Sequence, residues 1–157
     1  APLGADGIIY PGTCRTQPRT GPRPVDNALR LDMRKALRVI DTKSFHGAGP
    51  THMTDQIGDV VLARRDMGTS YHLSVVIDDA GQQITDVVRG ADLEEATPIH
   101  VILQHLLDLP TPTYHHHRLI RDEAGKRLAK RDDARALSKY RIKGTTPTDI
   151  RQILGLS

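Results

Sequence analysis

The stretch that most constrains the fold is residues 71–92, YHLSVVIDDAGQQITDVVRGAD, the most apolar and least interrupted part of the chain. It contains two β-branched runs, at 75–77 and 87–88, and the second run ends in Arg89 followed by Gly90. Glycine lets the backbone turn and lets a ligand approach closely. The pattern is therefore typical of a buried segment that presents a cation at the edge of a sheet.

Composition narrows the class of protein without identifying it. The 157 residues suit one domain with a single core. The net charge of +3 comes from 22 basic and 19 acidic residues that are largely intermixed, so it is compatible with a nucleic-acid partner without indicating one. One cysteine excludes an internal disulfide, and no apolar run approaches the about 18 residues of a membrane helix. We therefore expect a cytoplasmic protein with no membrane partner.

In the first half of the chain, turn residues dominate the pattern. Prolines and glycines interrupt residues 1–28, apart from a short extended piece at 8–10. Residues 29–45 are compatible with a short strand, a helical turn and a second strand. A loop is expected at 47–54 and a strand at 59–65.

Residues 97–109 carry the clearest helix signal. Thr97 is expected at the N-cap and Pro98 at the first helical position. The apolar stripe consists of Ile99, Ile102, Leu103, Leu106 and Leu107, and the residues that fall outside it are His100, Gln104, His105 and Asp108.

The C-terminal part reads as a strand, a loop and two short helices. The strand is expected at 114–120 and the charged loop at 121–131. One helix is expected at about 133–140, and the last opens with a capping box at 146–149 and ends at Gly155.

The histidines invite a metal interpretation, but their spacing argues against it. His115, His116 and His117 are consecutive, and neighbours on a strand point to opposite faces, so they cannot converge on one ion. His46 directly precedes the expected loop and His52 lies in it; both are more typical of exposed or locally bonded side chains than of ligands.

Four segments together carry a family resemblance: GDVVLARRD, YHLSVVIDDAGQQITDVVRGADL, TPIHVILQHLLDLPTPTYHH and GKRLAKRD. In order and spacing they resemble the second half of the class I catalytic domain of glutamyl-tRNA synthetases. The motif RGADL, at residues 89–93, is similar to that of a family of short paralogues, the glutamyl-Q tRNA(Asp) synthetases. The resemblance covers residues 58 to about 132. It implies an α/β fold, the second half of a Rossmann-type domain, with remnants of an inserted zinc and connective region and short C-terminal helices.

The resemblance also implies an organisation. Residues 1–28 would be a partial zinc-binding and linker segment, 29–70 the connective region, 71–120 the second half of the nucleotide-binding domain, and 121–157 the signature loop and C-terminal helices. Residues 73–80, which fit a strand by propensity and a helix by spacing, would be a helix, followed by a strand at 84–89.

Two residues match the family's glutamate pocket. Arg89 matches an arginine that holds the substrate, and Tyr71 matches a tyrosine that hydrogen-bonds it. An arginine suits this task because its planar fork can pair with a carboxylate through two hydrogen bonds. The alternatives are a salt bridge from Arg89 to Asp92 or Asp86, and simple packing of Tyr71.

The charged loop resembles the second class I signature, KMSKS. Here it reads Arg127-Leu128-Ala129-Lys130-Arg131, with arginine in place of the first lysine and alanine in place of the serine. Lys130 is the lysine expected to contact the phosphates of ATP, and Arg127 keeps a cation. The alternative is a solvated charged loop.

A zinc half-site is the third implication. Tyr10 and Cys14 match the Tyr-x-x-x-Cys part of a family zinc site whose Cys-x-Cys pair would lie before Ala1. Structural zinc takes four ligands, so these two cannot hold it tightly. Both interpretations, a zinc half-site and a packed tyrosine beside a lone thiol, remain open.

The resemblance implies an enzyme that activates L-glutamate with ATP and Mg²⁺, without tRNA, and transfers it to the queuosine base in the anticodon of tRNA(Asp). The HIGH signature of the first half is absent from these 157 residues, so we expect this chain to be the C-terminal half and inactive alone. Self-association is compatible with an uncovered sheet edge. The alternatives are a non-catalytic RNA-binding paralogue and a trimmed glutamyl-tRNA synthetase.

Overall fold

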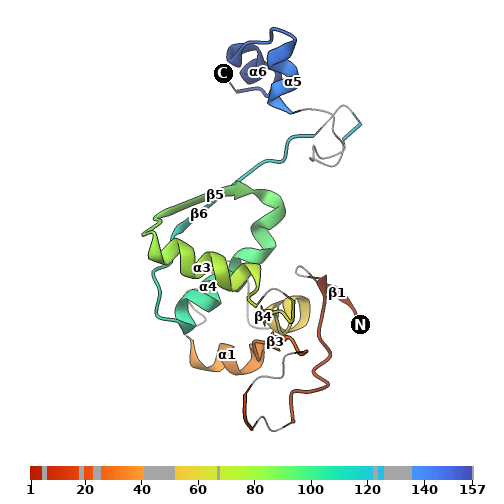
Figure 1. The fold of residues 1–157 in the computed structure, drawn as a ribbon, viewed down its shortest axis with the longest axis vertical. Helices are drawn as coiled ribbons and strands as arrows, with labels where there is room; N and C mark the ends of the chain where they lie inside the picture. Colours follow the sequence, from red (N-terminus) through yellow and green to blue (C-terminus); the bar gives the residue numbers. More distant parts are fainter. Residues whose placement is uncertain are drawn as a thin grey trace. The chain divides into compact units, whose positions relative to one another are not determined.

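The computed structural model of the chain describes residues 1–4, 7–17, 20–22, 26–40, 52–66, 68–121, 124–125 and 136–156. They form two compact units, residues 1–116 and residues 117–157. Figure 1 shows the elements of each unit. Within the part of the chain that is described, no helix combines the length and the hydropathy needed to cross a membrane.

The N-terminal region contains more regular structure than its prolines and glycines predict. Strands β1 (Leu3–Gly4) and β2 (Gly7–Ile8) pair antiparallel, with Leu3 opposite Ile8. The expectation of an irregular segment is therefore wrong for Leu3, Gly4 and Gly7, whereas Ile8 lies in the extended piece expected at 8–10. Gly7, at a φ of 102°, supplies the left-handed backbone that a tight turn needs.

A second antiparallel pair joins distant parts of the first unit. Strand β3 (Leu29–Arg30) pairs with β4 (Val61–Ala63), with an irregularity in register between Leu29 and Arg30. The strand expected at 59–65 is thus confirmed only at its centre.

Two helices flank this pair. Helix α1 (Met33–Val39) begins where the side chain of Asp32 accepts a hydrogen bond from the Lys35 amide, and it is longer than the single turn expected. The π-helix η2 (Met53–Ile57) replaces part of the expected loop, and the Gly58 amide closes it onto the Met53 carbonyl. Residues 41–51, where the second strand was expected, lie outside the described residues.

The ambiguous residues 73–80 lie in a helix, as the resemblance implied. Helix α3 (Tyr71–Gly81) starts after Ser70, whose hydroxyl accepts a hydrogen bond from the Leu73 amide. It ends at Gly81, and Gln83, two residues beyond this end, has a φ of 58°. The local cap and the helical spacing together outweigh the β-branched composition.

The next elements form a strand–helix–strand unit. Strand β5 (Asp86–Gly90) leads through the 3-10 helix η3 (Ala91–Ala96) into α4 (Thr97–Leu106), which returns to β6 (Thr113–His117). The Thr113 amide bonds to the Thr85 carbonyl at the start of the strands, and Arg89 contacts His116 near their ends. The strands therefore run parallel, as in one crossover of an α/β sheet, and β6 is shorter than the expected strand.

Thr97 is not the N-cap of α4, contrary to the sequence-based expectation. Because η3 runs directly into the helix, the residue before the helix is Ala96, with helical dihedral angles and no capping side chain. The hydroxyl of Thr97 is instead used in a contact with Arg89.

The core of the first unit lies between α1, η2, α3 and α4. Its fully buried members are Met33, Met53, Val60, Val76, Ile99 and Ile102. These side chains come from residues up to 69 positions apart (33 to 102), so the apolar stripes of the helices hold the unit together.

The second unit contains two short helices, α5 (Leu137–Ile142) and α6 (Pro147–Ile153). Helix α5 starts later than expected, at residue 137, and residues 131–135 lie outside the described residues. The capping box of α6 is confirmed: Thr146 and Asp149 exchange side-chain and backbone hydrogen bonds. The guanidinium of Arg118 donates to the Leu154 carbonyl just after α6.

Candidate functional site

Arg89 stands near the end of β5, and its guanidinium is held at three atoms. Its Nε donates to His116 Nε2 at 3.2 Å, its Nη1 contacts His100 Nδ1 at 3.0 Å, and its Nη2 donates to Thr97 Oγ1 at 2.7 Å. The partners come from α4 and β6. The strand–helix–strand unit therefore fixes this side chain from two elements besides its own.

The aromatic ring of Tyr114 completes the support of the guanidinium. Arg89 Cζ lies 4.8 Å from the centre of that ring, a cation–π distance. The Tyr114 hydroxyl accepts a hydrogen bond from Gln104 Nε2 at 2.9 Å, and burial raises the pKa of the phenol. Tyr114 therefore stays neutral at physiological pH and offers its ring face to the cation.

These four partners of Arg89 carry no negative charge. They are two imidazoles, one hydroxyl and one aromatic ring. Asp86, one of the two carboxylates considered as a salt-bridge partner, instead pairs with His115 at 3.0 Å, and this hydrogen bond lowers the pKa of Asp86. The positive charge of Arg89 is therefore suited to an anionic ligand.

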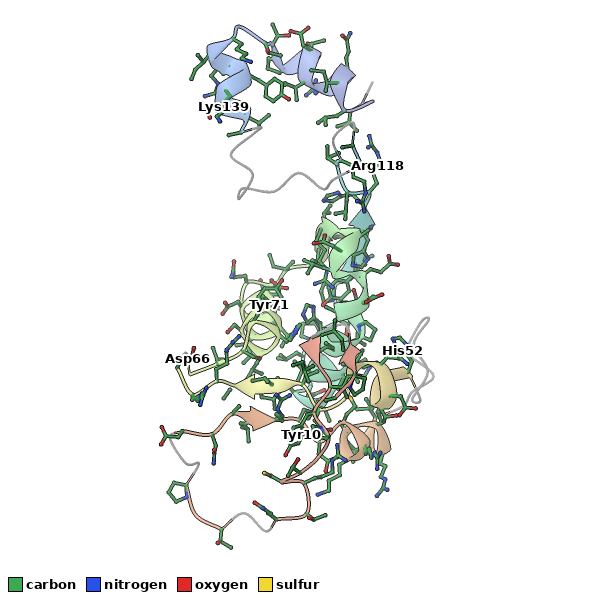
Figure 2. The ribbon with its side chains drawn as sticks, turned by 90° about the vertical axis from the view of Figure 1, so that its right-hand side faces the viewer. Tyr10, His52, Asp66, Tyr71, Arg118 and Lys139 are labelled. Carbon is green, nitrogen blue, oxygen red and sulfur yellow. The ribbon has the colours of Figure 1, made fainter. Side chains whose placement is uncertain are left out.

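Tyr71 lies near the same cluster, in the first turn of α3 (Figure 2). Its ring contacts the rings of His72 and His100 edge-on, with centroids 5.5 and 6.0 Å apart. More than half of the tyrosine is exposed, at 54%, whereas His100 is 1% exposed. Since His100 contacts both residues, the structure places Tyr71 and Arg89, the two predicted glutamate-binding residues, against one buried imidazole.

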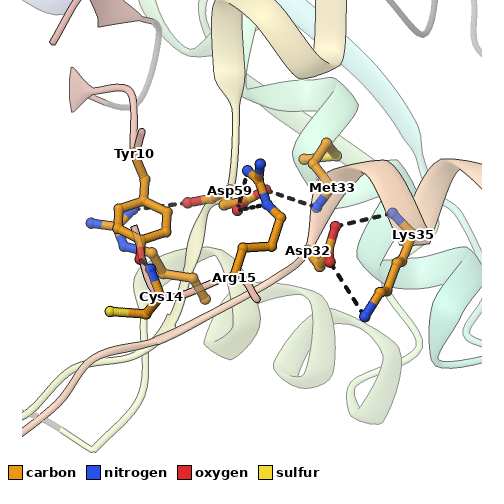
Figure 3. A network of polar contacts seen from close by, with 8 residues as sticks. Tyr10, Cys14, Arg15, Asp32, Met33, Lys35 and Asp59 are labelled. Carbon is orange, nitrogen blue, oxygen red and sulfur yellow. Dashed lines mark hydrogen bonds and ion pairs between the residues drawn. The ribbon is translucent and has the colours of Figure 1, made fainter. Parts of the chain in front are cut away.

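Tyr10 and Cys14 also lie together, as Figure 3 shows. The Cys14 amide donates to the Tyr10 hydroxyl at 2.6 Å, and Arg30 lies 4.9 Å from the centre of the tyrosine ring. The thiol is exposed. The two residues predicted as a zinc half-site are therefore neighbours, and the hydroxyl of Tyr10 already serves a local turn.

Asp59 anchors this segment, and the sequence analysis did not single it out. Its carboxylate, 5% exposed, accepts two hydrogen bonds from Arg15, at 3.1 and 2.6 Å, and one from the Met33 amide at 3.0 Å. Its carbonyl accepts from Arg30 at 2.8 Å. The hydrogen bond to Asp59 raises the pKa of Arg15. The pair ties the Tyr10–Cys14 segment to the start of α1 (Figure 3).

The described residues do not fit a complete zinc site. No three His, Cys, Asp or Glu side chains among them gather in a metal-binding arrangement. Tyr10 and Cys14 supply two of the four donors that structural zinc takes. The zinc assignment therefore stays a prediction about two ligands.

The predicted ATP-binding loop, Arg127-Leu128-Ala129-Lys130-Arg131, lies outside the described residues. Its role also stays a prediction.

Several residues of the Arg89 cluster escaped the sequence analysis. His100 and Gln104 fall outside the apolar stripe of the helix, yet both are 1% exposed. On β6 the alternation of burial turns Tyr114 and His116 toward Arg89 and leaves His115 and His117 exposed. Side chains at alternate positions of a strand lie on the same face. This periodicity could have grouped Tyr114 with His116 from the sequence.

Comparison with known families decides the class of the chain. The family model described as tRNA synthetases class I (E and Q), catalytic domain, matches residues 29–157. The chain belongs to this family.

Relatives of this class I synthetase chain cover nearly all of it. A glutamyl-Q tRNA(Asp) synthetase of Rhodobacter capsulatus is 60% identical over 168 aligned residues, covering 99% of this chain and 59% of the relative. A protein of the same name from Verminephrobacter eiseniae is 42% identical, covering 88% of the chain and 49% of the relative. The synthetase chain thus spans less than two thirds of either relative.

Among solved structures, a glutamate tRNA ligase of Elizabethkingia meningosepticum, in complex with its amino acid, matches 69% of this synthetase chain and 20% of its own. The match has a TM-score of 0.47 and 27% sequence identity.

Proposed function

We propose that the protein carrying this chain activates glutamate with ATP and transfers it to the queuosine base in the anticodon of tRNA(Asp). The relative from Rhodobacter capsulatus, with 60% identity across 99% of the chain, supports this assignment by its name. The observation that carries the proposal is the arrangement of Arg89: a guanidinium fixed among uncharged partners beside Tyr71.

Arg89 would bind a carboxylate of glutamate. A guanidinium has five N–H groups, and three of its nitrogens make one contact each here, so two N–H groups remain for a ligand. A pair of hydrogen bonds to one carboxylate is the strongest arrangement for this side chain. Tyr71 is exposed and contacts the imidazole of His100. Its hydroxyl would donate a hydrogen bond to the substrate.

Activation would take place when a glutamate carboxylate oxygen attacks the α-phosphorus of ATP. A bond forms between the carboxylate oxygen and the α-phosphorus, which gives glutamyl-adenylate. The bond between the α-phosphorus and the bridging oxygen breaks, which releases pyrophosphate. Mg²⁺ bound with ATP would neutralise phosphate charge. Lys130 and Arg127 would hold the leaving pyrophosphate by electrostatic attraction.

Transfer would join the activated carboxyl group to a hydroxyl of queuosine, releasing AMP. The low excess of positive charge, +3 over the chain, is compatible with an RNA substrate.

The first test is glutamate-dependent exchange of pyrophosphate into ATP, without tRNA. We would run it on this chain alone and on the product of the complete reading frame that encodes it. We expect exchange with glutamate in the longer product, none with aspartate or glutamine, and none in the chain alone. Absence of exchange in every form would reject the enzymatic proposal and favour an RNA-binding paralogue.

Arg89 provides the matched variant. Arg89→Lys keeps the charge and loses the planar fork, so we expect at least a tenfold rise in the KM for glutamate, since a hydrogen bond to a charged group contributes about 1.5–3 kcal/mol. Arg65→Lys, on an exposed residue, is the control and should leave the KM unchanged.

The second test identifies the acceptor. We would compare tRNA(Asp) containing queuosine with the same tRNA lacking it, and locate the attached glutamate. Attachment at the 3′ end would instead identify a glutamyl-tRNA synthetase.

A further inference from the structure

His100 is a fully enclosed member of the Arg89 cluster, and both of its ring nitrogens are in polar contacts. It is 1% exposed and lies in the first turn of α4. Its Nδ1 lies 3.0 Å from Arg89 Nη1, and its Nε2 lies 2.9 Å from Nδ1 of His72, which is 7% exposed. His72 follows Tyr71 in α3. A continuous chain of contacts thus joins the arginine of β5 to the helix that carries Tyr71.

The direction of each hydrogen bond follows from the chemistry of arginine. A guanidinium can only donate, so His100 Nδ1 must accept from Arg89. A neutral imidazole has one N–H, which then sits on Nε2 and donates to His72 Nδ1. By the same reasoning His116 Nε2 accepts from Arg89 Nε. The observed geometry therefore specifies a neutral His100 with its proton on Nε2.

Protonation of His100 would remove this arrangement. A second N–H, on Nδ1, would point at a guanidinium nitrogen 3.0 Å away, which removes the acceptor and places two like charges in contact. Buried like charges at this distance repel strongly because little water screens them.

Groups from three elements contact the His100 ring. They are Arg89 of β5, Tyr71 and His72 of α3, and Tyr114 of β6. Asp79 of α3 acts electrostatically on Tyr114. The acidic side chains of η3 and the basic side chains of α1, the other elements packed on α4, are exposed: Asp92, Glu94, Glu95, Arg34, Lys35 and Arg38.

We propose that His100 is a positioning residue for the substrate-binding arginine. As a neutral acceptor it fixes the orientation of the Arg89 guanidinium relative to Tyr71. The arginine is then already oriented for binding when the substrate arrives. Fixing a long side chain in advance reduces the entropy lost on binding. This inference rests on the proposed function. It implies that glutamate binding weakens as His100 becomes protonated.

Two variants separate the acceptor from the volume of the side chain. His100→Asn places an amide oxygen where Nδ1 stood and cannot be protonated, whereas His100→Leu fills the space without an acceptor. Both would be made in the product of the complete reading frame, with thermal unfolding monitored by circular dichroism. The KM and kcat for glutamate would be measured by pyrophosphate exchange between about pH 8 and about pH 5.5, where histidine titrates.

For the unmodified protein, we expect the KM for glutamate to rise only toward the acid end of this range, because the neighbouring guanidinium opposes protonation of His100. His100→Leu should raise the KM about tenfold at high pH, change kcat much less, and lose the further rise on acidification. His100→Asn should keep the KM within about threefold, because the acceptor is retained, and should also show no rise.

Three results would overturn the proposal. One is an unchanged KM and an unchanged pH profile in His100→Leu. Another is a pH-dependent rise that persists in His100→Asn, which would assign the titration to a different group such as His116. The third is an equal rise of the KM for glutamate in both variants at high pH, which would mean that His100 acts only through packing. If the leucine variant does not fold, the pH profile of the asparagine variant still decides.

A measurement without substrate keeps this inference separate from the proposed function. Nitrogen-15 spectra of the imidazoles at neutral pH report which nitrogen carries the proton. We expect His100 with its proton on Nε2. A proton on Nδ1, or on both nitrogens, would overturn the inference even if glutamate exchange is found. Conversely, if exchange is absent while the expected tautomer is observed, the function fails and the hydrogen-bond chain stands.

Discussion

At the residue scale, the arrangement around Arg89 uses uncharged groups to hold a charge. A carboxylate in the same place would bind the guanidinium more strongly, but it would also neutralise the charge that an anionic substrate needs. Imidazole, hydroxyl and aromatic ring give direction without neutralisation. This lack of neutralisation is the physical basis of the proposal that Arg89 binds an anion rather than serving in a structural ion pair.

Thr97 gives the test of this arrangement. Its hydroxyl receives the Nη2 hydrogen bond of Arg89 at 2.7 Å and lies 3.1 Å from His116 Nε2. We expect Thr97→Val, which keeps the shape and removes the hydroxyl, to raise the KM for glutamate about tenfold. Thr97→Ser should stay near the unmodified value. The KM in pyrophosphate exchange measures both, and equal values for valine and serine would contradict the role of the hydroxyl.

At the element scale, Asp59 joins three parts of the first unit that are distant in sequence. It binds Arg15, the start of α1 and Arg30 of β3. Because these contacts involve a buried carboxylate, its removal leaves donors without partners. The segment with Tyr10 and Cys14 therefore depends on Asp59 for its position.

We expect Asp59→Asn to lower the free energy of unfolding of the first unit by about 2 kcal/mol, because the amide has one acceptor oxygen and cannot serve both Arg15, bound at Oδ2, and the Met33 amide, bound at Oδ1. Denaturant unfolding followed by circular dichroism is the measurement. Asp66→Asn is the control: its pair with Arg64, at 3.8 Å, is exposed on both sides and should contribute less than about 0.5 kcal/mol. Similar losses in both variants would contradict the assignment.

The ends of α3 and α4 show a second rule at this scale. After α3, the Gln83 amide bonds to the Ala80 carbonyl and the Ile84 amide bonds to the Asp79 carbonyl, while Gln83 has a φ of 58°. The same pattern follows α4 at Asp108, with a φ of 54°. Both are Schellman ends in which a side chain occupies the left-handed position that glycine prefers.

Gln83→Gly should therefore stabilise the first unit by about 0.5–1 kcal/mol, because glycine adopts the left-handed conformation without the steric cost of a Cβ atom. The neighbouring Gln82, at a φ of −89°, is the matched control, and Gln82→Gly should destabilise by a similar amount. The midpoint of urea unfolding reports both. Equal signs for the two variants would show that the left-handed conformation is not the cause.

At the scale of the whole molecule, the two compact units are stabilised differently. The first has a buried cluster of apolar side chains drawn from four helices. The described helices of the second unit contain no buried residues, and several of their apolar side chains are exposed, including Leu137, Ile142 and Ile153. Local contacts such as helix caps therefore contribute a larger share of the order of the second unit.

The capping box of α6 makes this unit sensitive to acid. The hydroxyl and the amide of Thr146 lower the pKa of Asp149 below its ordinary value of 3.8. A lowered pKa in the folded state means that the contribution to stability is present above about pH 4 and is lost as the pH falls through the lowered pKa. We expect the amide resonances of Thr146 and Asp149 to lose their dispersion below about pH 4. In Asp149→Asn this transition should be absent; its persistence would assign it to another group.

The sequence by itself determined the features that depend on near neighbours. Ser70 and Thr146 begin helices because each hydroxyl reaches an amide three residues ahead. The family resemblance singled out Tyr71 and Arg89, and the structure brings both into contact with His100. Their roles in binding glutamate, and that of residues 127–131 in binding ATP, remain predictions.

Only the tertiary structure decided what surrounds those two residues. His100 and Gln104 appear polar and outward-facing on the helix because its stripe points toward one core, yet β5, β6 and α3 cover the opposite side as well. Threonine is a common N-cap residue, but the N-cap of α4 is Ala96, the last residue of the preceding 3-10 helix. The hydroxyl of Thr97 therefore accepts a hydrogen bond from Arg89 instead. In both cases the deciding contacts come from residues far away in the sequence or from a neighbouring element, which local propensity does not register.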